Sequence, residues 1–305
     1  MNKSKATIFN LLIITVLASS LSANEVEFYV NYSRKSSIEI QNDSIPVKNK
    51  KVKDKPENRK MTGSKGKITF ESFDKNYERA MKYYKNQQWL SAARLFEELY
   101  PLSIGTPASD TILFSFADCY FQNHDYELSA FHYKEYTRRF PGTQRTQDAA
   151  YRCVEAIYNI SPTYSLDQTE TKYAIEEIVH FVQQYPYSNH VEKCNILLDE
   201  MRNKLAKKDF EVAKLYYNTE NYDAAQIAIK NFLKEYPDSP LTPESMMLLV
   251  QNNYKYAKKS IKAKQRERYL DCLSAYDALR INYPDSPFVA QVKPIIDDVL
   301  KKTSK

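Results

Sequence analysis

Helical periodicity governs the chain from Phe70 to its end. Apolar residues there recur every three or four positions, which is the spacing of a helix with one buried face. Three stretches repeat one pattern: Ala, a Tyr three positions later, an aromatic residue six further on, and a small residue three after that. They cover residues 80–101, 117–141 and 213–237, and each ends in Pro. The pattern predicts pairs of antiparallel helices, in which the small residues allow close approach and the proline stops the second helix.

Two degenerate units follow the same plan, at residues 173–188 and 269–286, each with a small residue twelve positions before a Pro. Successive unit-ending prolines are 45, 51 and 47 residues apart, whereas a tetratricopeptide (TPR) repeat takes about 34 residues. We expect the surplus in an insertion at 159–171 and in a basic, extended helical stretch at 255–268. The prediction is an all-α fold, a right-handed superhelical solenoid of about five TPR-like helix hairpins with a C-terminal capping helix.

The N-terminal residues differ from this body. Residues 1–23 carry basic Lys3 and Lys5, an apolar run and then small residues, as a secretory signal does. The run is shorter than the roughly 20 residues of a membrane span, and an uncleaved anchor is the alternative. The expected organisation is a signal peptide at 1–23, a disordered basic linker at 24–70 and a solenoid at 71–305, with repeats at about 74–104, 110–144, 147–189, 207–240 and 246–287 and a cap at 287–302.

The net charge of +6 lies outside the repeats. Residues 71–305 hold 31 basic and 32 acidic residues, whereas residues 24–70 hold 11 basic and 6 acidic ones. A nucleic-acid-binding surface should lie on the folded domain, so we expect no nucleic-acid partner. A weak contact of the linker with an anionic membrane is one use of its lysines, and a solvated spacer is the other.

The sequence contains no arrangement of residues that indicates catalysis. The four cysteines, Cys119, Cys153, Cys194 and Cys272, lack metal-ligand spacing, and buried free thiols are favoured over disulfides. The four histidines form no zinc motif, and only 4 glycines occur in the chain, too few for phosphate-binding loops. We therefore expect no enzyme activity, no cofactor and no metal.

A binding surface is expected on the inner side of the solenoid, which the first helix of each hairpin should line. Aromatic residues beside polar ones suit an extended peptide there. Phe114 and Phe210 are equally consistent with core positions. Tyr84, Phe121 and Tyr217 each follow an inward Tyr and are expected to be more exposed. The residues expected to line such a peptide groove in the first two units are Tyr77, Met81, Tyr84, Lys85, Asp118, Phe121 and Gln122.

The chain resembles the BamD family, the TPR lipoproteins of the outer-membrane β-barrel assembly (BAM) machinery. The resemblance rests on the export signal, the five TPR-like units and the ending "YPDSP". The resemblance covers about residues 72–300. The stretches "SLDQTETKYAIEEIVHFVQQYPYS", "KLAKKDFEVAKLYYNTENYDAAQIAIKNFLKEYPDSP" and "KQRERYLDCLSAYDALRINYPDS" are similar to Bacteroidetes members.

The resemblance implies a non-enzymatic scaffold on the periplasmic face of the outer membrane. In that family the N-terminal repeats receive unfolded barrel proteins, and the C-terminal repeats hold the POTRA domains of the BamA-like barrel insertase. The basic stretch Lys255 to Arg268 would face acidic residues of the insertase, or it is an ordinary solvated helix face. The partner-binding residues expected on this basis are Lys214, Tyr217, Asn218, Lys255, Lys259, Lys262 and Arg266.

One position departs from the family. Its members carry a lipid-modified Cys at the end of the signal, where this chain has Asn24, so we expect no lipidation. The chain is then a soluble paralogue held by its protein partner, or it keeps residues 6–20 as an anchor, or it relies on the basic tail together with its partner. We favour an exported, peripheral protein retained at the outer membrane by a partner, because a single acyl chain is itself a marginal anchor.

Two rival functions fit the same fold. A periplasmic TPR adaptor of the Tol–Pal or cell-division type would carry an N-terminal coiled coil, and residues 24–70 show no heptads. A saccharide-binding protein would present exposed Trp platforms, and the single Trp, Trp89, falls at an internal packing position. The barrel-assembly function is therefore the one the sequence favours.

Overall fold

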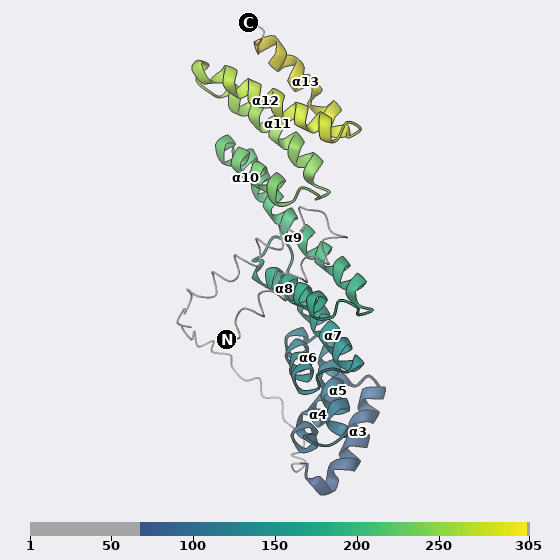
Figure 1. Cartoon of the computed structure of the whole chain (residues 1–305). Coiled ribbons are helices and arrows are strands. Elements are labelled where there is room, and N and C mark those ends of the chain that lie inside the picture. Colours follow the sequence, from purple (N-terminus) through teal and green to yellow (C-terminus); the bar gives the residue numbers. More distant parts are fainter. Residues whose placement is uncertain (1–67, 304–305) are drawn as a thin grey trace, which may run out of the picture. The chain divides into compact units, whose positions relative to one another are not determined.

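The computed structural model describes residues 68–303, and all regular structure in this range is helical (Figure 1). The predictions for the signal peptide, for Asn24 and for nearly all of the linker lie outside the described residues. The elements are η1 (Phe70–Ser72), α3 (Phe73–Lys85), α4 (Trp89–Ser103), α5 (Ala108–Gln122), α6 (Tyr126–Arg139), α7 (Gln144–Ile160), α8 (Thr169–Gln184), α9 (Val191–Asn218), α10 (Tyr222–Glu235), α11 (Thr242–Lys258), α12 (Lys262–Asn282) and α13 (Pro287–Thr303).

Each helix packs against the next one along the chain, which is the arrangement of stacked helical hairpins. The small residues of the repeated pattern lie where two helices meet. Ala80, Ala92, Ala117, Ala213 and Ala225 are completely buried, so the helix backbones approach closely there. The predicted all-α, TPR-like solenoid is confirmed.

Three of the tight turns between paired helices contain a left-handed residue, and none of these three uses Gly. Gln87, His124 and Glu220 occupy the equivalent position in three hairpins and have φ values of 58°, 65° and 61°. Such a conformation is unfavourable for a residue with a Cβ. Packing of the hairpin therefore fixes these turns, which explains how the chain manages with so few glycines.

Prolines stop the second helix of most hairpins but not of the first. Helices α6, α8, α10 and α12 each end two residues before a Pro. Pro101, in contrast, lies inside α4, which continues to Ser103. The expectation that Pro101 ends its helix is wrong. The lost N–H would have bonded the carbonyl of Glu97, an exposed residue whose backbone can be hydrated.

Helix α9 is a single helix of 28 residues, although the sequence indicated a repeat beginning near residue 207. Its first half packs in the core built from α3 to α8, and its second half, from Ala206, packs in the core of α10 to α13. The second half corresponds to α5 when Ala213 is matched with Ala117. Phe116 and Cys119 of α5 are buried, but their counterparts Val212 and Leu215 are 39% and 58% exposed.

The basic stretch 255–268 is not one continuous helix, so that expectation is wrong. Helix α11 ends at Lys258, and α12 begins at Lys262. The turn between them is held by Gln265, whose Nε2 donates to the carbonyl of Ser260 over 2.9 Å, and by Arg268, which bonds the Ser260 hydroxyl. The last turn of α11 and the start of α12 therefore form a protruding end of a hairpin.

The chain closes with α13, which packs on α11 and α12 through Val292, Ile296 and Val299. Charged residues, among them Lys293 and Asp297, occupy its exposed side, as expected for a cap. Among residues 68–303, no helix combines the length and apolarity required to cross a membrane. Ile68, which falls in the segment expected to be a linker, is buried.

Candidate protein-binding surfaces

The residues predicted for a peptide groove lie on α3 and α5, and the structure joins these two helices through Tyr84. Its hydroxyl donates to Oδ2 of Asp118 over 2.5 Å. Tyr133 on α6 donates to the other carboxylate oxygen over 3.3 Å, and Gln122 also donates to it over 3.4 Å. Burial and the Asp118 carboxylate raise the pKa of Tyr84 and of Tyr133. Both phenols therefore remain donors at any physiological pH.

This network changes the role of two predicted residues. Asp118 is only 7% exposed, so it is a buried acceptor and not a surface contact, contrary to our expectation. Tyr84 is half-buried because its ring packs against Trp89 and Phe96. Of the predicted groove residues on α3 and α5, Lys85 and Gln122 are exposed, while Tyr77, Met81, Tyr84 and Phe121 are half-buried.

Two arginines of α7 lie over two phenylalanines of α5. The Arg145 guanidinium carbon lies 5.0 Å from the Phe114 ring centroid, and that of Arg152 lies 5.2 Å from the Phe121 ring centroid. Arg145 also pairs with Asp110 at 3.0 Å, and Arg152 pairs with Glu155 at 3.0 Å. Phe114 and Phe121 thus contribute to a half-buried aromatic surface with cations on one side. Phe210 is entirely buried, which settles its role as a core residue.

The second predicted surface combines α9 and α11. The Lys255 ammonium lies 4.2 Å from the Tyr217 ring centroid, and the hydrogen bond to Tyr217 raises the pKa of Lys255. Lys259 pairs with Glu220 and lies 5.6 Å from the Tyr222 ring centroid. The structure therefore brings Tyr217 near Lys255 and Lys259, although the two lysines lie about forty residues after Tyr217 in the sequence.

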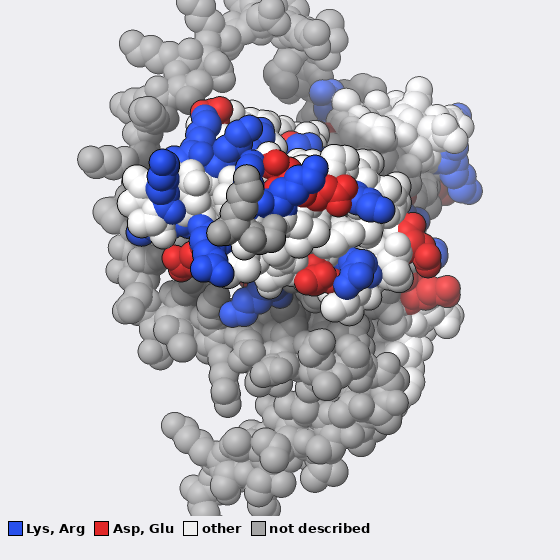
Figure 2. Space-filling view, turned by 90° about the horizontal axis from the view of Figure 1, so that it is seen from above, with Lys and Arg blue, Asp and Glu red and all other residues white. Residues whose placement is uncertain are grey.

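The other predicted partner-binding residues lie around this cluster. Lys214 contacts Glu211 and Glu244 at 3.7 and 3.9 Å, and Asn218 is exposed at the end of α9. Lys262 and Arg266 are exposed on the first turns of α12. Figure 2 looks down on the end of the molecule that carries α11 to α13, and Lys and Arg side chains gather on one side of it.

In the fourth unit the exposures of Tyr216 and Tyr217 are the reverse of what we expected. Tyr216 is among the exposed aromatic residues, whereas Tyr217 packs partly against the core of α10 to α13. The reason is the length of α9. Its second half extends beyond α8, so the face that carries Val212, Leu215 and Tyr216 has no preceding hairpin against it. The sequence does not predict the exposure of this face, because the repeat pattern around Ala213 is regular.

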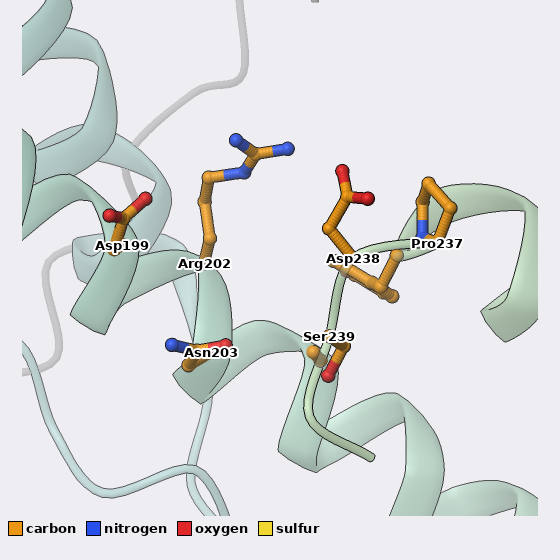
Figure 3. Close-up of a pocket in the computed structure, with 8 residues that line it drawn as sticks. Asp199, Arg202, Asn203, Pro237, Asp238 and Ser239 are labelled. Atoms are coloured by element: carbon orange, nitrogen blue, oxygen red, sulfur yellow. The ribbon is translucent and has the colours of Figure 1, made fainter. Parts of the chain in front are cut away.

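A shallow hollow of about 270 Å³ opens beside the turn after α10. Arg202 on α9 and Asp238 in the turn extend toward each other across it, and Asp199, Asn203 and Ser239 line its walls (Figure 3). In residues 68–303 no group of three or more His, Cys, Asp or Glu side chains is arranged to hold a metal ion.

All four cysteines are free and buried, as the sequence indicated. Burial raises the pKa of the Cys119, Cys153, Cys194 and Cys272 thiols to about 12. None of them is therefore a nucleophile at neutral pH, because the thiolate is the reactive form.

Comparison with known proteins identifies the family to which this chain is similar. The sequence model described as "YfiO: Outer membrane lipoprotein" matches residues 71–270. A curated relative, "Outer membrane protein assembly factor BamD" of Vibrio cholerae, is 23% identical over 184 residues, which cover 56% of this chain and 75% of that protein.

Two solved TPR structures are also similar at low identity. The P58(IPK) TPR domain shares 11% identity over 77% of this chain and 67% of its own, with a TM-score of 0.37. The TPR2AB domain of yeast Sti1, solved as a pHSP90 complex, shares 15% identity over 78% of this chain and 100% of its own, with a TM-score of 0.35. The family match covers most of the helical body, and the chain belongs to the YfiO family of outer membrane lipoproteins.

Proposed function

We propose that this chain is a non-enzymatic scaffold of the outer-membrane β-barrel assembly machinery, positioned at the periplasmic face of the outer membrane. The observation that carries the proposal is the family match over residues 71–270, together with the similarity to an outer membrane protein assembly factor. Stacked helical hairpins give such a protein long surfaces for other proteins, and four unreactive thiols are consistent with a binding role.

The client surface of this proposal is formed by α3 and α5. Tyr77, Met81, Tyr84 and Phe121 supply half-buried aromatic and sulfur-bearing contact area, and Lys85 and Gln122 supply exposed polar groups at its edge. Asp118 acts from beneath, because it fixes the orientation of the Tyr84 ring. Pre-ordered rings bind an extended peptide at low entropic cost. The ligand in this proposal is an unfolded segment of a barrel protein.

The insertase surface is the cluster on α9 and α11, extended by Lys262 and Arg266. Lys255 and Lys259 are held over Tyr217 and Tyr222, so their charges are positioned before a partner arrives. Basic groups at an interface chiefly accelerate and orient association with an acidic surface. The proposed partner is the POTRA region of a barrel insertase.

Retention at the membrane follows from these partners. With Asn24 in place of the lipid-bearing Cys, the proposal relies on the insertase interface, aided by contact of the basic linker with anionic lipid. A protein interface of ordinary size binds far more strongly than a single acyl chain inserts.

Affinity capture tests this function. The epitope-tagged chain is recovered from detergent-solubilised envelopes, and its partners and N-terminal peptide are read by mass spectrometry. We expect a POTRA-bearing insertase together with an unlipidated N-terminus. Recovery of division or Tol–Pal proteins without an insertase would replace this function with that of a periplasmic adaptor.

A further inference from the structure

The turn between α11 and α12 combines positive charge with an exposed apolar side chain. Residues 255–268 contain seven Lys or Arg and one acidic residue, Glu267. Ile261, at the turn itself, is 69% exposed. We define the α11–α12 tip as Ile261, Lys262, Lys264 and Arg266, all of which are exposed.

Local helix preferences do not account for these side chains. Ile261 occupies the N-cap of α12 with extended backbone angles and no capping hydrogen bond, at a position where Ser, Thr, Asp or Asn is preferred. The first turn of α12 carries Lys262 and Lys264 and no acidic residue. Cations are unfavourable at a helix N-terminus. The tip is therefore built against local helix preferences, and its residues serve something outside the folded core.

Contacts of Arg268 and Gln265 hold the tip in place. The Arg268 guanidinium lies 3.6 Å from the Tyr256 ring centroid, and its Nη2 donates to the Tyr256 hydroxyl over 2.8 Å. Gln265 and Arg268 both bond Ser260, which precedes Ile261. Ile261 is thus fixed in its exposed position, and the hydrophobic side chain cannot withdraw into the core without breaking these contacts.

We infer that the α11–α12 tip contacts an anionic phospholipid surface. A convex turn with an apolar residue at its apex and cations around it matches the membrane interface: Ile261 enters the acyl boundary, while Lys262, Lys264 and Arg266 reach headgroup phosphates along their aliphatic stems. An acidic protein surface would account for the cations but not for the exposed Ile261. The tip shares Lys262 and Arg266 with the proposed insertase surface, so the experiments below distinguish a lipid surface from an acidic protein, and it is separate from the basic linker.

Vesicle flotation of the purified full chain tests the charges. The probes are phosphatidylcholine vesicles with and without phosphatidylglycerol. Replacing Lys262, Lys264 and Arg266 together by Gln should weaken binding to the anionic vesicles roughly a hundredfold, since each cation near such a surface contributes about a fivefold gain in affinity. The matched control replaces Lys172, Lys230 and Lys234 by Gln, which are equally charged and exposed. It should bind as the unaltered chain does, and equal loss in both triple variants would overturn the inference.

A second experiment tests the apolar residue. Ile261→Ser should weaken vesicle binding about fivefold through lost apolar burial, whereas Ile281→Ser, at an equally exposed site on α12, should not. An environment-sensitive fluorophore on Ile261→Cys should shift to the blue with anionic vesicles, and one on Ile281→Cys should not; the native thiols are buried. If the tip variants bind vesicles normally but lose an insertase in affinity capture, the tip binds an acidic protein and the lipid contact is refuted.

Discussion

The Tyr84 hydroxyl lies 2.5 Å from Oδ2 of Asp118, and this hydrogen bond fastens α3 to α5. Asp118 is buried, and its carboxylate accepts hydrogen bonds from Tyr84, Tyr133 and Gln122. A buried carboxylate without such partners is strongly unfavourable. The bond therefore links the first two hairpins and orients the Tyr84 ring on the proposed client surface.

Removing the Tyr84 hydroxyl should destabilise the protein. We expect Tyr84→Phe to lower the free energy of unfolding by about 1–2 kcal/mol, because it leaves a buried acceptor with fewer donors. Chemical denaturation measures the change. Tyr187→Phe is the control, since Tyr187 is 97% exposed and its hydroxyl is hydrated. Equal stabilities of the two variants would show that the bond to Asp118 is unimportant.

The uncovered face of α9 predicts a contrast between two leucines. Leu113 in α5 is completely buried, whereas Leu215 in α9 is 58% exposed although the repeat pattern places it at a packing position. Leu113→Ala should cost about 2–5 kcal/mol through the cavity it leaves. Leu215→Ala should cost less than about 0.5 kcal/mol. A large cost at Leu215 would mean that another element covers this face.

The sequence pattern predicted the hairpins because small residues and aromatics recur at fixed spacing. Small residues such as Ala80 and Ala213 are buried where two helices pack closely. The repeat pattern missed the continuous α9 because it placed a new unit near residue 207, although no glycine or proline between Val191 and Ala213 interrupts the helix. It also misplaced Asp118, which was expected to line the groove but is buried, because Tyr84 and Tyr133 from other helices donate hydrogen bonds to it. Burial of charge is a property of the tertiary structure.

Protonation of His132 should make stability depend on pH. His132 packs between Phe116, at 4.3 Å between ring centroids, and Tyr120. Burial lowers its pKa below 6.5, although the nearby Glu135 and Glu97 carboxylates oppose this. The unfolded chain therefore binds the proton more tightly, so the stabilisation is complete above pH 6.5 and is lost as the pH falls toward the lowered value.

Thermal unfolding between neutral and mildly acidic pH checks this dependence. His132→Asn should show a smaller loss of Tm on acidification than the unaltered chain. His180→Asn serves as the control, because His180 is exposed on α8. If His132→Asn and the unaltered chain lose stability in parallel, His132 is not the responsible group.

The four buried thiols predict a labelling pattern. Cys119, Cys153, Cys194 and Cys272 should resist alkylation in the native protein near pH 8, because burial both shields them and raises their pKa to about 12. In denaturant without reductant, all four should react. Mass spectrometry counts the adducts, and fewer than four in the unfolded chain would reveal a disulfide that contradicts the structure.

Site-specific photo-crosslinking at Tyr217 tests whether the cluster on α9 and α11 contacts an insertase. A photoreactive amino acid replaces Tyr217 in cells, where it faces Lys255 in the proposed insertase surface, and the same substitution at Tyr187 provides the control. The account predicts a crosslink to a POTRA-bearing barrel insertase from position 217 and none from position 187. A crosslink from position 217 to Tol–Pal or division proteins, with no insertase, would contradict it.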